Sequence, residues 1–348
     1  MVEQHDDIIA KLFDLPLAKE NTSSEATRVH YEDHLGRIAR SMMEDYDLVM
    51  GGKRYTMLEI EAYLTAPNHG HADPYCHGHP RQKRAGYWFF HMAGMSESFR
   101  GGSRKGVDIT IGNPKHNSAG GMLIRAVLDQ STNKVVEGPS LLVDEILRVC
   151  KHKSLDSLTK TPWPGQCWSK KSLFYLEKKP SSSDLNNEED DEDIASSTVT
   201  RRIKRQKLDQ HKNKTVYTSC RVGLGLGNRS PSIEARLLFV GRPYRFVMEP
   251  WLLKKGRIWT IFGMFEQQTI SNDNIVRLTG VTKSLLPKYK DEFDAGEKDP
   301  NDTIRACLNG KDIVSGSAQW KLRVMAAVRW WECHAKEGEK FKLVGVKK

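Results

Sequence analysis

One carboxylate, one aromatic ring and one imidazole lie within a short span of the sequence. Glu61 and Tyr63 belong to the segment Glu61-Ala62-Tyr63-Leu64, and His77 ends the segment Asp73-Pro74-Tyr75-Cys76-His77. Two rings can hold a flat heterocycle by stacking, and a carboxylate beside them can activate a water. Each residue type is common, so the weight of this set depends on the segments that follow it.

The segments around these residues predict the elements that would position them. Residues 58–64 alternate apolar and polar side chains, which predicts a half-buried strand, and the turn 65–68 follows. The same criteria predict further strands at 86–91, 106–112, 121–128, 235–240 and 244–248, and helices at 31–46, 141–150, 272–278 and 318–335.

The order of five short motifs resembles the alkyladenine (3-methyladenine) DNA glycosylase family over about residues 50–250. The matching motifs are the Glu-Ala-Tyr-Leu strand at 61–64, the Asp-Pro-x-x-His turn at 73–77, Leu-Ile-Arg-Ala at 123–126, Gly-Pro-x-x-Leu at 138–142 and Arg-Val-Gly-x-Gly at 221–225. Each motif is weak alone. Members of this family excise alkylated or deaminated purines, and the resemblance implies no metal or other cofactor.

The resemblance assigns roles only where the residues match. Glu61 corresponds to the carboxylate that activates the attacking water, and Arg125 to the arginine near that water. Tyr63 and His77 correspond to rings that sandwich the flipped base. The resemblance also places Arg221 at the DNA interface.

Three positions depart from the family pattern. Asp108 replaces an asparagine that screens the edge of the base; because an ionised carboxylate only accepts hydrogen bonds, we expect a base with an N–H donor at that edge. His91 replaces a third stacking tyrosine. The segment 92–105 differs from the family's intercalating hairpin, and we expect Phe99 as the wedge, with Met95 as second choice, and Arg100, Arg104 and Lys105 facing phosphates.

The same residues also have plainer interpretations. Glu61 could be a solvated strand residue, Arg125 could pair with Glu59 or Glu61 only to satisfy its charge, and Tyr63 could be core. The loop 69–79 collects histidines, Asp73 and Cys76, residue types that suit zinc. Its spacing fits no regular finger and the chain has no Cys-x-x-Cys pair, so no metal is predicted.

Charge and cysteine usage favour a nuclear protein that binds nucleic acid. The net charge is +10, although an acidic run occupies 188–193, and basic surfaces attract phosphate backbones. Six scattered cysteines fit a reducing compartment, and no apolar run is long enough to span a bilayer. The basic cluster at 201–207 is typical of a nuclear import signal.

The resemblance implies a mixed α/β (α+β) protein with a single barrel-like core, as in the alkyladenine DNA glycosylase / formyltransferase C-terminal-domain-like fold. We expect an N-terminal helical segment (1–50), a glycosylase-like core (51–180 and 214–250), a disordered charged insertion (181–213) and a helical C-terminal extension (251–348) that covers the core or binds a protein partner. The predicted function is excision of damaged purines by a monomer acting on double-stranded DNA. Two alternatives remain: a binding protein that has lost excision, and a glycosidase acting on RNA or modified nucleosides.

Overall fold

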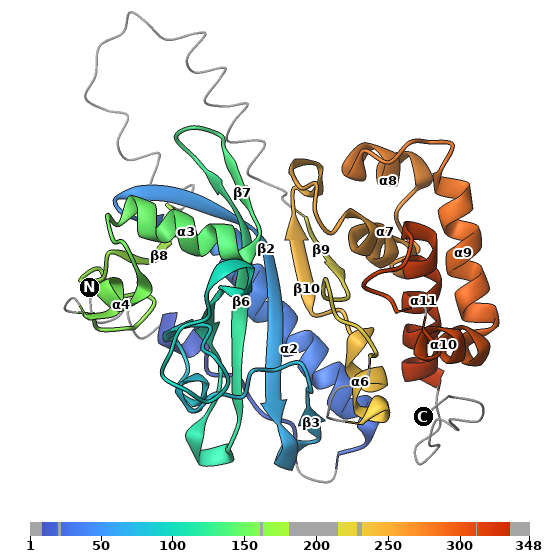
Figure 1. Ribbon diagram of the computed structural model, residues 1–348, viewed down its shortest axis with the longest axis horizontal. Coiled ribbons are helices and arrows are strands. Elements are labelled where there is room, and N and C mark those ends of the chain that lie inside the picture. The colour runs from blue at the N-terminus through green and yellow to red at the C-terminus, as the bar shows by residue number, and fades with distance from the viewer. Residues whose placement is uncertain are drawn as a thin grey trace, which may run out of the picture.

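The protein is mixed α/β, with one antiparallel sheet and a group of helices at one end of it (Figure 1). The computed structural model describes residues 9–19, 22–160, 163–180, 215–227, 232–310 and 312–334. The charged insertion and the import signal predicted within 181–213 lie outside the described residues.

The sheet has ten strands, and every pairing is antiparallel. The strands are β1 (Tyr46–Met50), β2 (Lys53–Ala66), β3 (His71–Ala72), β4 (Trp88–Phe90), β5 (Val107–Thr110), β6 (Ala119–Asp129), β7 (Val135–Glu137), β8 (Phe174–Lys178), β9 (Val216–Ser219) and β10 (Arg245–Met248). Their order is β4-β5-β6-β2-β1-β8, while β3 and β10 also pair with β2, β7 with β6, and β9 with β10.

This sheet is open, so the expected barrel-like core is wrong. Among the described strands, no pairing joins β4 to β8. The reason lies in β2, which is 14 residues long and offers successive stretches to β1, β10 and β3 while β6 runs beside it over most of its length. The sheet therefore branches at β2 instead of closing.

Helix α2 (Ser24–Asp45) precedes the sheet and packs against β1, β2 and β10. Ser23 caps its N-terminus by accepting a hydrogen bond from the Ala26 N–H at 3.3 Å. The helix buries Tyr31, Leu35, Ile38 and Met42, which recur at helical spacing. The predicted helix at 31–46 is thus present and begins earlier, at Ser24.

Two further helices, α3 (Pro139–Val149) and α4 (Leu155–Lys160), follow β7. Helix α3 packs against β5, β6 and β7, with Leu142, Val143 and Ile146 in the main core. Pro139 at its first turn fits the rule that proline is favoured where the backbone N–H has no partner within the helix.

The C-terminal helices gather beyond β9 and β10 (Figure 1). They are α6 (Ile233–Val240), α7 (Arg257–Glu266), α8 (Asn272–Thr279), α9 (Leu286–Lys298), α10 (Pro300–Leu308) and α11 (Ala318–His334). The strand predicted at 235–240 is wrong, because these residues form α6. Its short apolar run is ambiguous by pattern, and Ser232 settles it by capping the Ala235 N–H at 3.3 Å.

The apolar stripe of α11 is buried within the chain. Val324, Val328 and Trp331 pack with Leu237 and Val240 of α6 and with residues of α10. Along the described ranges, no helix combines the length and apolarity that crossing a membrane requires.

Candidate active site

Register across the sheet brings the chemically active side chains onto one face. Asp108 of β5 lies opposite Leu123 of β6, Leu123 lies opposite Glu61 of β2, and Glu61 lies opposite Arg245 of β10. Directly opposed residues point to the same side of a sheet. Since neighbouring strands are about 4.8 Å apart, Asp108 and Glu61 are about 10 Å apart along this row.

Glu61 is fully buried, and three hydrogen bonds hold its carboxylate. The Val222 N–H donates to Oε1 at 2.7 Å, while the Tyr63 hydroxyl and Arg125 Nη1 donate to Oε2 at 2.8 and 3.1 Å. An ionised carboxylate offers about four lone-pair positions, so one remains for a water. The interpretation of Glu61 as a solvated strand residue is therefore wrong.

Arg125 joins Glu61 to a second buried carboxylate, Glu59. Its Nε donates to Glu59 Oε1 at 3.0 Å, and Arg245 Nε donates to the same oxygen at 2.6 Å. Burial alone would raise the pKa of Glu59, but the charges of Arg245 and Arg125 outweigh it and hold that pKa below its ordinary value. The Arg125 side chain is 15% exposed, so its guanidinium remains within reach of a ligand.

Tyr63 contacts Arg221 through its ring as well as Glu61 through its hydroxyl. The Arg221 guanidinium carbon lies 4.4 Å from the ring centroid. Burial, followed by the charge of Glu61, raises the pKa of Tyr63 well above its ordinary value, so the hydroxyl remains a donor. Arg221 therefore covers one face of the Tyr63 ring.

Arg221 is buried, which contradicts its predicted place at the DNA interface. It forms a two-pronged ion pair with Asp73 and also donates to the carbonyls of Ala62 and Phe239. A buried guanidinium needs such partners. Arg221 therefore positions Tyr63 and the Asp73 turn, and it does not face a phosphate.

His77, His91 and Asp108 lie together near Phe89. The rings of His77 and His91 are almost parallel, with centroids 6.1 Å apart. A base between two rings needs about 7 Å, twice a contact distance of about 3.5 Å, so it does not fit between these two as they stand. Phe89 lies opposite Asp108 in the sheet and contacts both histidine rings.

Asp108 is occupied by protein partners, contrary to the expected role in reading the base edge. Its Oδ1 is 2.9 Å from His91 Nε2, and its Oδ2 accepts from Gln82 Nε2 at 2.9 Å. The carboxylate is buried beneath these two side chains. Asp108 therefore orients His91 and fixes the proton on Nε2 of that ring.

His77 has a buried ring nitrogen without a partner. Arg100 Nη2 is 3.4 Å from Nδ1, which places the proton of the neutral ring on Nε2, and Nε2 is a buried nitrogen with no hydrogen-bond partner among the described residues. Burial, Arg100 and His91 lower the pKa of His77, so the ring is neutral near pH 7. A ligand acceptor would satisfy this donor.

The two residues considered as a wedge in the hairpin 92–105 differ in their surroundings. Phe99 packs on the core, edge-on to Phe90, whereas Met95 is 65% exposed. Of the two residues, Met95 is therefore the more exposed. The difference arises because Met92 and Phe99 form a bridge that turns Phe99 inward.

The three basic residues predicted in this region differ in their exposure. Arg104 is exposed. Lys105 is paired with Asp144 of α3, and Arg100 donates to the Met92 carbonyl and contacts His77. Arg104 is the one of the three that is open to a phosphate as it stands.

No metal site emerges from the histidine-rich loop. Within the described part of the chain, no three His, Cys, Asp or Glu residues are placed to hold an ion. His71 instead bonds the Leu64 carbonyl and Tyr244, and His79 caps a short 3-10 helix.

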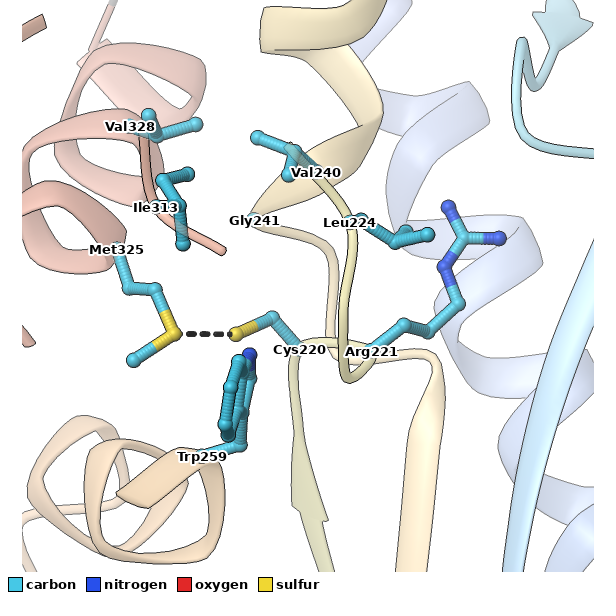
Figure 2. A pocket seen from close by; sticks show the side chains of 9 residues that line it. All are labelled: Cys220, Arg221, Leu224, Val240, Gly241, Trp259, Ile313, Met325 and Val328. Carbon is cyan, nitrogen blue, oxygen red and sulfur yellow. Dashed lines mark hydrogen bonds between the residues drawn. The ribbon is translucent and has the colours of Figure 1, made fainter. Parts of the chain in front are cut away.

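A separate narrow pocket lies between β9 and the C-terminal helices (Figure 2). Cys220, Trp259 and Met325 line it, with the Cys220 thiol 3.1 Å from the Met325 sulfur, and Arg221 extends away from them. Its empty space amounts to about 210 Å³ in total, but it is nowhere wide enough for a water molecule. It is a packing gap, distinct from the Glu61 site.

The sequence had left two members of the site unidentified, Arg245 and Gln82. The signal for Arg245 is the one already applied to Arg125, an arginine within an apolar strand that must have a buried partner. Gln82 lies in the 3-10 helix Pro80–Lys83, and nothing in its local sequence indicates the contact with Asp108.

Comparison with known proteins identifies no family. No family profile matches the chain, and no solved structure matches it. The chain is similar to "Uncharacterized protein L759" from Acanthamoeba polyphaga mimivirus, at 32% identity over 139 residues. That match covers 37% of this chain and 63% of the viral protein, whose name states no function.

Proposed function

We propose that the protein is a monofunctional DNA N-glycosylase that removes a damaged purine from double-stranded DNA in the nucleus. The observation that carries the proposal is the state of Glu61, a buried carboxylate held by Arg125, Tyr63 and the Val222 N–H with one acceptor position left. The motif order that resembles the alkyladenine glycosylase family supports the same function.

In the proposed reaction, Glu61 accepts a proton from a water whose oxygen attacks C1′. The bond between C1′ and the base nitrogen breaks, and the base leaves with the bonding electrons. The sugar becomes positively charged on the way, so the buried carboxylate also stabilises the transition state. General-base assistance of this kind is worth about 10²–10⁴-fold in rate. The product is an abasic site, and no lysine nucleophile is invoked.

The base would be held by the rings of Tyr63 and His77. Tyr63 offers the face not covered by Arg221, and His77 offers a ring with an unpartnered Nε2–H donor. A purine carries ring-nitrogen acceptors that this donor can satisfy. Flipping the nucleotide out of the helix costs a few kcal/mol, which an exposed apolar side chain such as Met95 lowers by entering the gap.

The test is base release from duplexes that each carry hypoxanthine, ethenoadenine, 3-methyladenine or 7-methylguanine. We expect alkali-labile abasic sites from the parent on at least one substrate and none from Glu61→Gln. Glu145→Gln is the matched control, because Glu145 is also a buried carboxylate bonded to a tyrosine, Tyr55, and an arginine, Arg148. No release by the parent from any substrate, with DNA binding retained, would replace this proposal with a binding protein.

A further inference from the structure

Helix α7 begins beside the candidate active site. Gly256 caps it with a φ of 68°, a conformation that favours glycine, and no side chain bonds the first N–H groups of the helix. A Cβ at Gly256 would lie 3.1 Å from the Val222 side chain, and the Val222 N–H holds Glu61. The start of α7 therefore covers the loop that holds Glu61, the proposed general base.

A buried cation lies directly beneath this helix start. The same Cβ at Gly256 would lie 2.6 Å from Arg245 Nη2. Arg245 is fully buried; its Nε bonds Glu59 and its Nη1 bonds Ser219 and Thr260, but Nη2 has no partner among the described residues. The free N–H groups of the helix start and an unsatisfied guanidinium nitrogen thus lie together, both able to donate to an anion.

Three exposed cations surround the same point: Lys254, Lys255 and Arg257. Glu137 contacts this segment: its carboxylate accepts the Lys255 backbone N–H, and Lys255 Nζ donates to the Glu137 carbonyl at 3.0 Å. Trp251, 53% exposed, lies just before them. Exposed cations suit a nucleic-acid backbone, and an exposed ring beside them can stack on a base.

The start of α3 connects these cations to the predicted DNA-binding hairpin. Lys255 Nζ would be 3.4 Å from a Cβ at Gly138, whose N–H donates to the Arg125 carbonyl at 2.7 Å. Two residues further on, Ser140 donates to the Gly102 carbonyl of the hairpin segment at 2.8 Å. Direct contacts therefore join the hairpin segment, the start of α3 and the segment that precedes α7.

We infer that the start of α7, with Lys254, Lys255 and Arg257, binds backbone phosphates of duplex DNA on the side of the site opposite the hairpin. The inference rests on the proposed function for the identity of the partner, and it gives the C-terminal helices a part in DNA binding. The strand would cross the site between the hairpin and α7, with the flipped nucleotide over Glu61.

The experiment measures binding of an undamaged labelled duplex by fluorescence anisotropy at several salt concentrations. The variant is Lys254→Ala/Arg257→Ala, which removes two exposed charges and leaves the Lys255 contacts intact. The control is Lys288→Ala/Lys298→Ala, which removes two exposed charges from α9. We expect about tenfold weaker binding for the α7 variant and a salt slope smaller by about 1–2, since each phosphate contact contributes about 0.9.

Equal affinity and equal salt slope for the two variants would overturn the inference. Because the duplex is undamaged, the result does not depend on excision. Weaker binding by the α7 variant, in a protein that releases no base, would uphold the phosphate surface and reject the glycosylase. Base release by the parent, with equal duplex binding by the two variants, would support the glycosylase and reject the phosphate surface. If the double variant Lys254→Ala/Arg257→Ala fails to fold, the same binding measurement compares Lys254→Ala with Lys288→Ala.

Discussion

The Arg221 guanidinium covers one face of the Tyr63 ring, with its central carbon 4.4 Å from the ring centroid. Arg221 is fixed there by Asp73, so the covered face is unavailable to a ligand. The Tyr63 hydroxyl holds Glu61, and we propose that the face of its ring away from Arg221 stacks on the base.

Substitutions at Tyr63 should separate these two functions. Tyr63→Phe keeps the ring and loses the 2.8 Å hydrogen bond to Glu61, so we expect base release to slow by about tenfold with little change in KM. Tyr63→Ala should also raise KM, because stacking is worth about 1–3 kcal/mol. Steady-state kinetics on the best substrate measures both. An unchanged KM in Tyr63→Ala would remove the ring from the base site.

Asp108→Asn should alter His91 and leave base preference unchanged. Both oxygens of Asp108 already serve His91 and Gln82, so the base does not meet this carboxylate. An amide offers one acceptor oxygen in place of two, so we expect a weaker hydrogen bond between residue 108 and His91. We expect the same ranking of the four damaged bases at a lower rate. A changed ranking would restore the direct reading role expected from the sequence.

Met95 and Phe99 should respond oppositely to truncation. Met95 is largely exposed, so Met95→Ala should leave stability unchanged and slow base release from duplex DNA more than from single strands. Phe99→Ala should destabilise the fold by about 1–3 kcal/mol, because its ring packs on the core beside Phe90. Urea unfolding and parallel assays on the two DNA forms test this. Equal slowing on both forms would exclude Met95 as a wedge.

Acid should destabilise the protein through His71. Burial, followed by the charge of Arg242, lowers the pKa of His71 well below 6.5, so the folded protein keeps this ring neutral. The unfolded chain binds a proton there more readily, and stability is therefore complete above about pH 6.5 and falls as pH drops below it. We expect His71→Asn to lose less stability than the parent between about pH 7.5 and 5.5 in urea titrations. Identical losses would assign the acid sensitivity to other groups.

The local pattern of the sequence predicted several elements of the fold. The alternation in 58–64 indicated β2, and helical spacing indicated α2, α3, α8 and α11. What local pattern could not supply was the partner of each element. Whether β4 and β8 meet depends on pairings distant in sequence, so the local pattern could not test the barrel that the resemblance implied, and the sheet is open.

The site shows the same division between local and distant information. Two residues apart on one strand, Glu61 and Tyr63 share a face by the period of the strand alone. The burial of Arg221 and the contacts of Asp108 depend on the turn at Asp73 and on Gln82, which fold back from other segments. The sequence therefore identified Arg221 and Asp108 as notable charged residues, but it did not predict which side chains surround them.

Single-turnover base release shows whether Glu61 activates the water. The parent, Glu61→Gln and Glu145→Gln are compared on one duplex that the parent converts to an abasic site, with enzyme in excess. We expect a loss of at least about 10²-fold for Glu61→Gln, near-parental rates for Glu145→Gln and equal DNA binding by all three. A Glu61→Gln rate within a few fold of the control would contradict this expectation and leave Glu61 as a buried partner for Arg125.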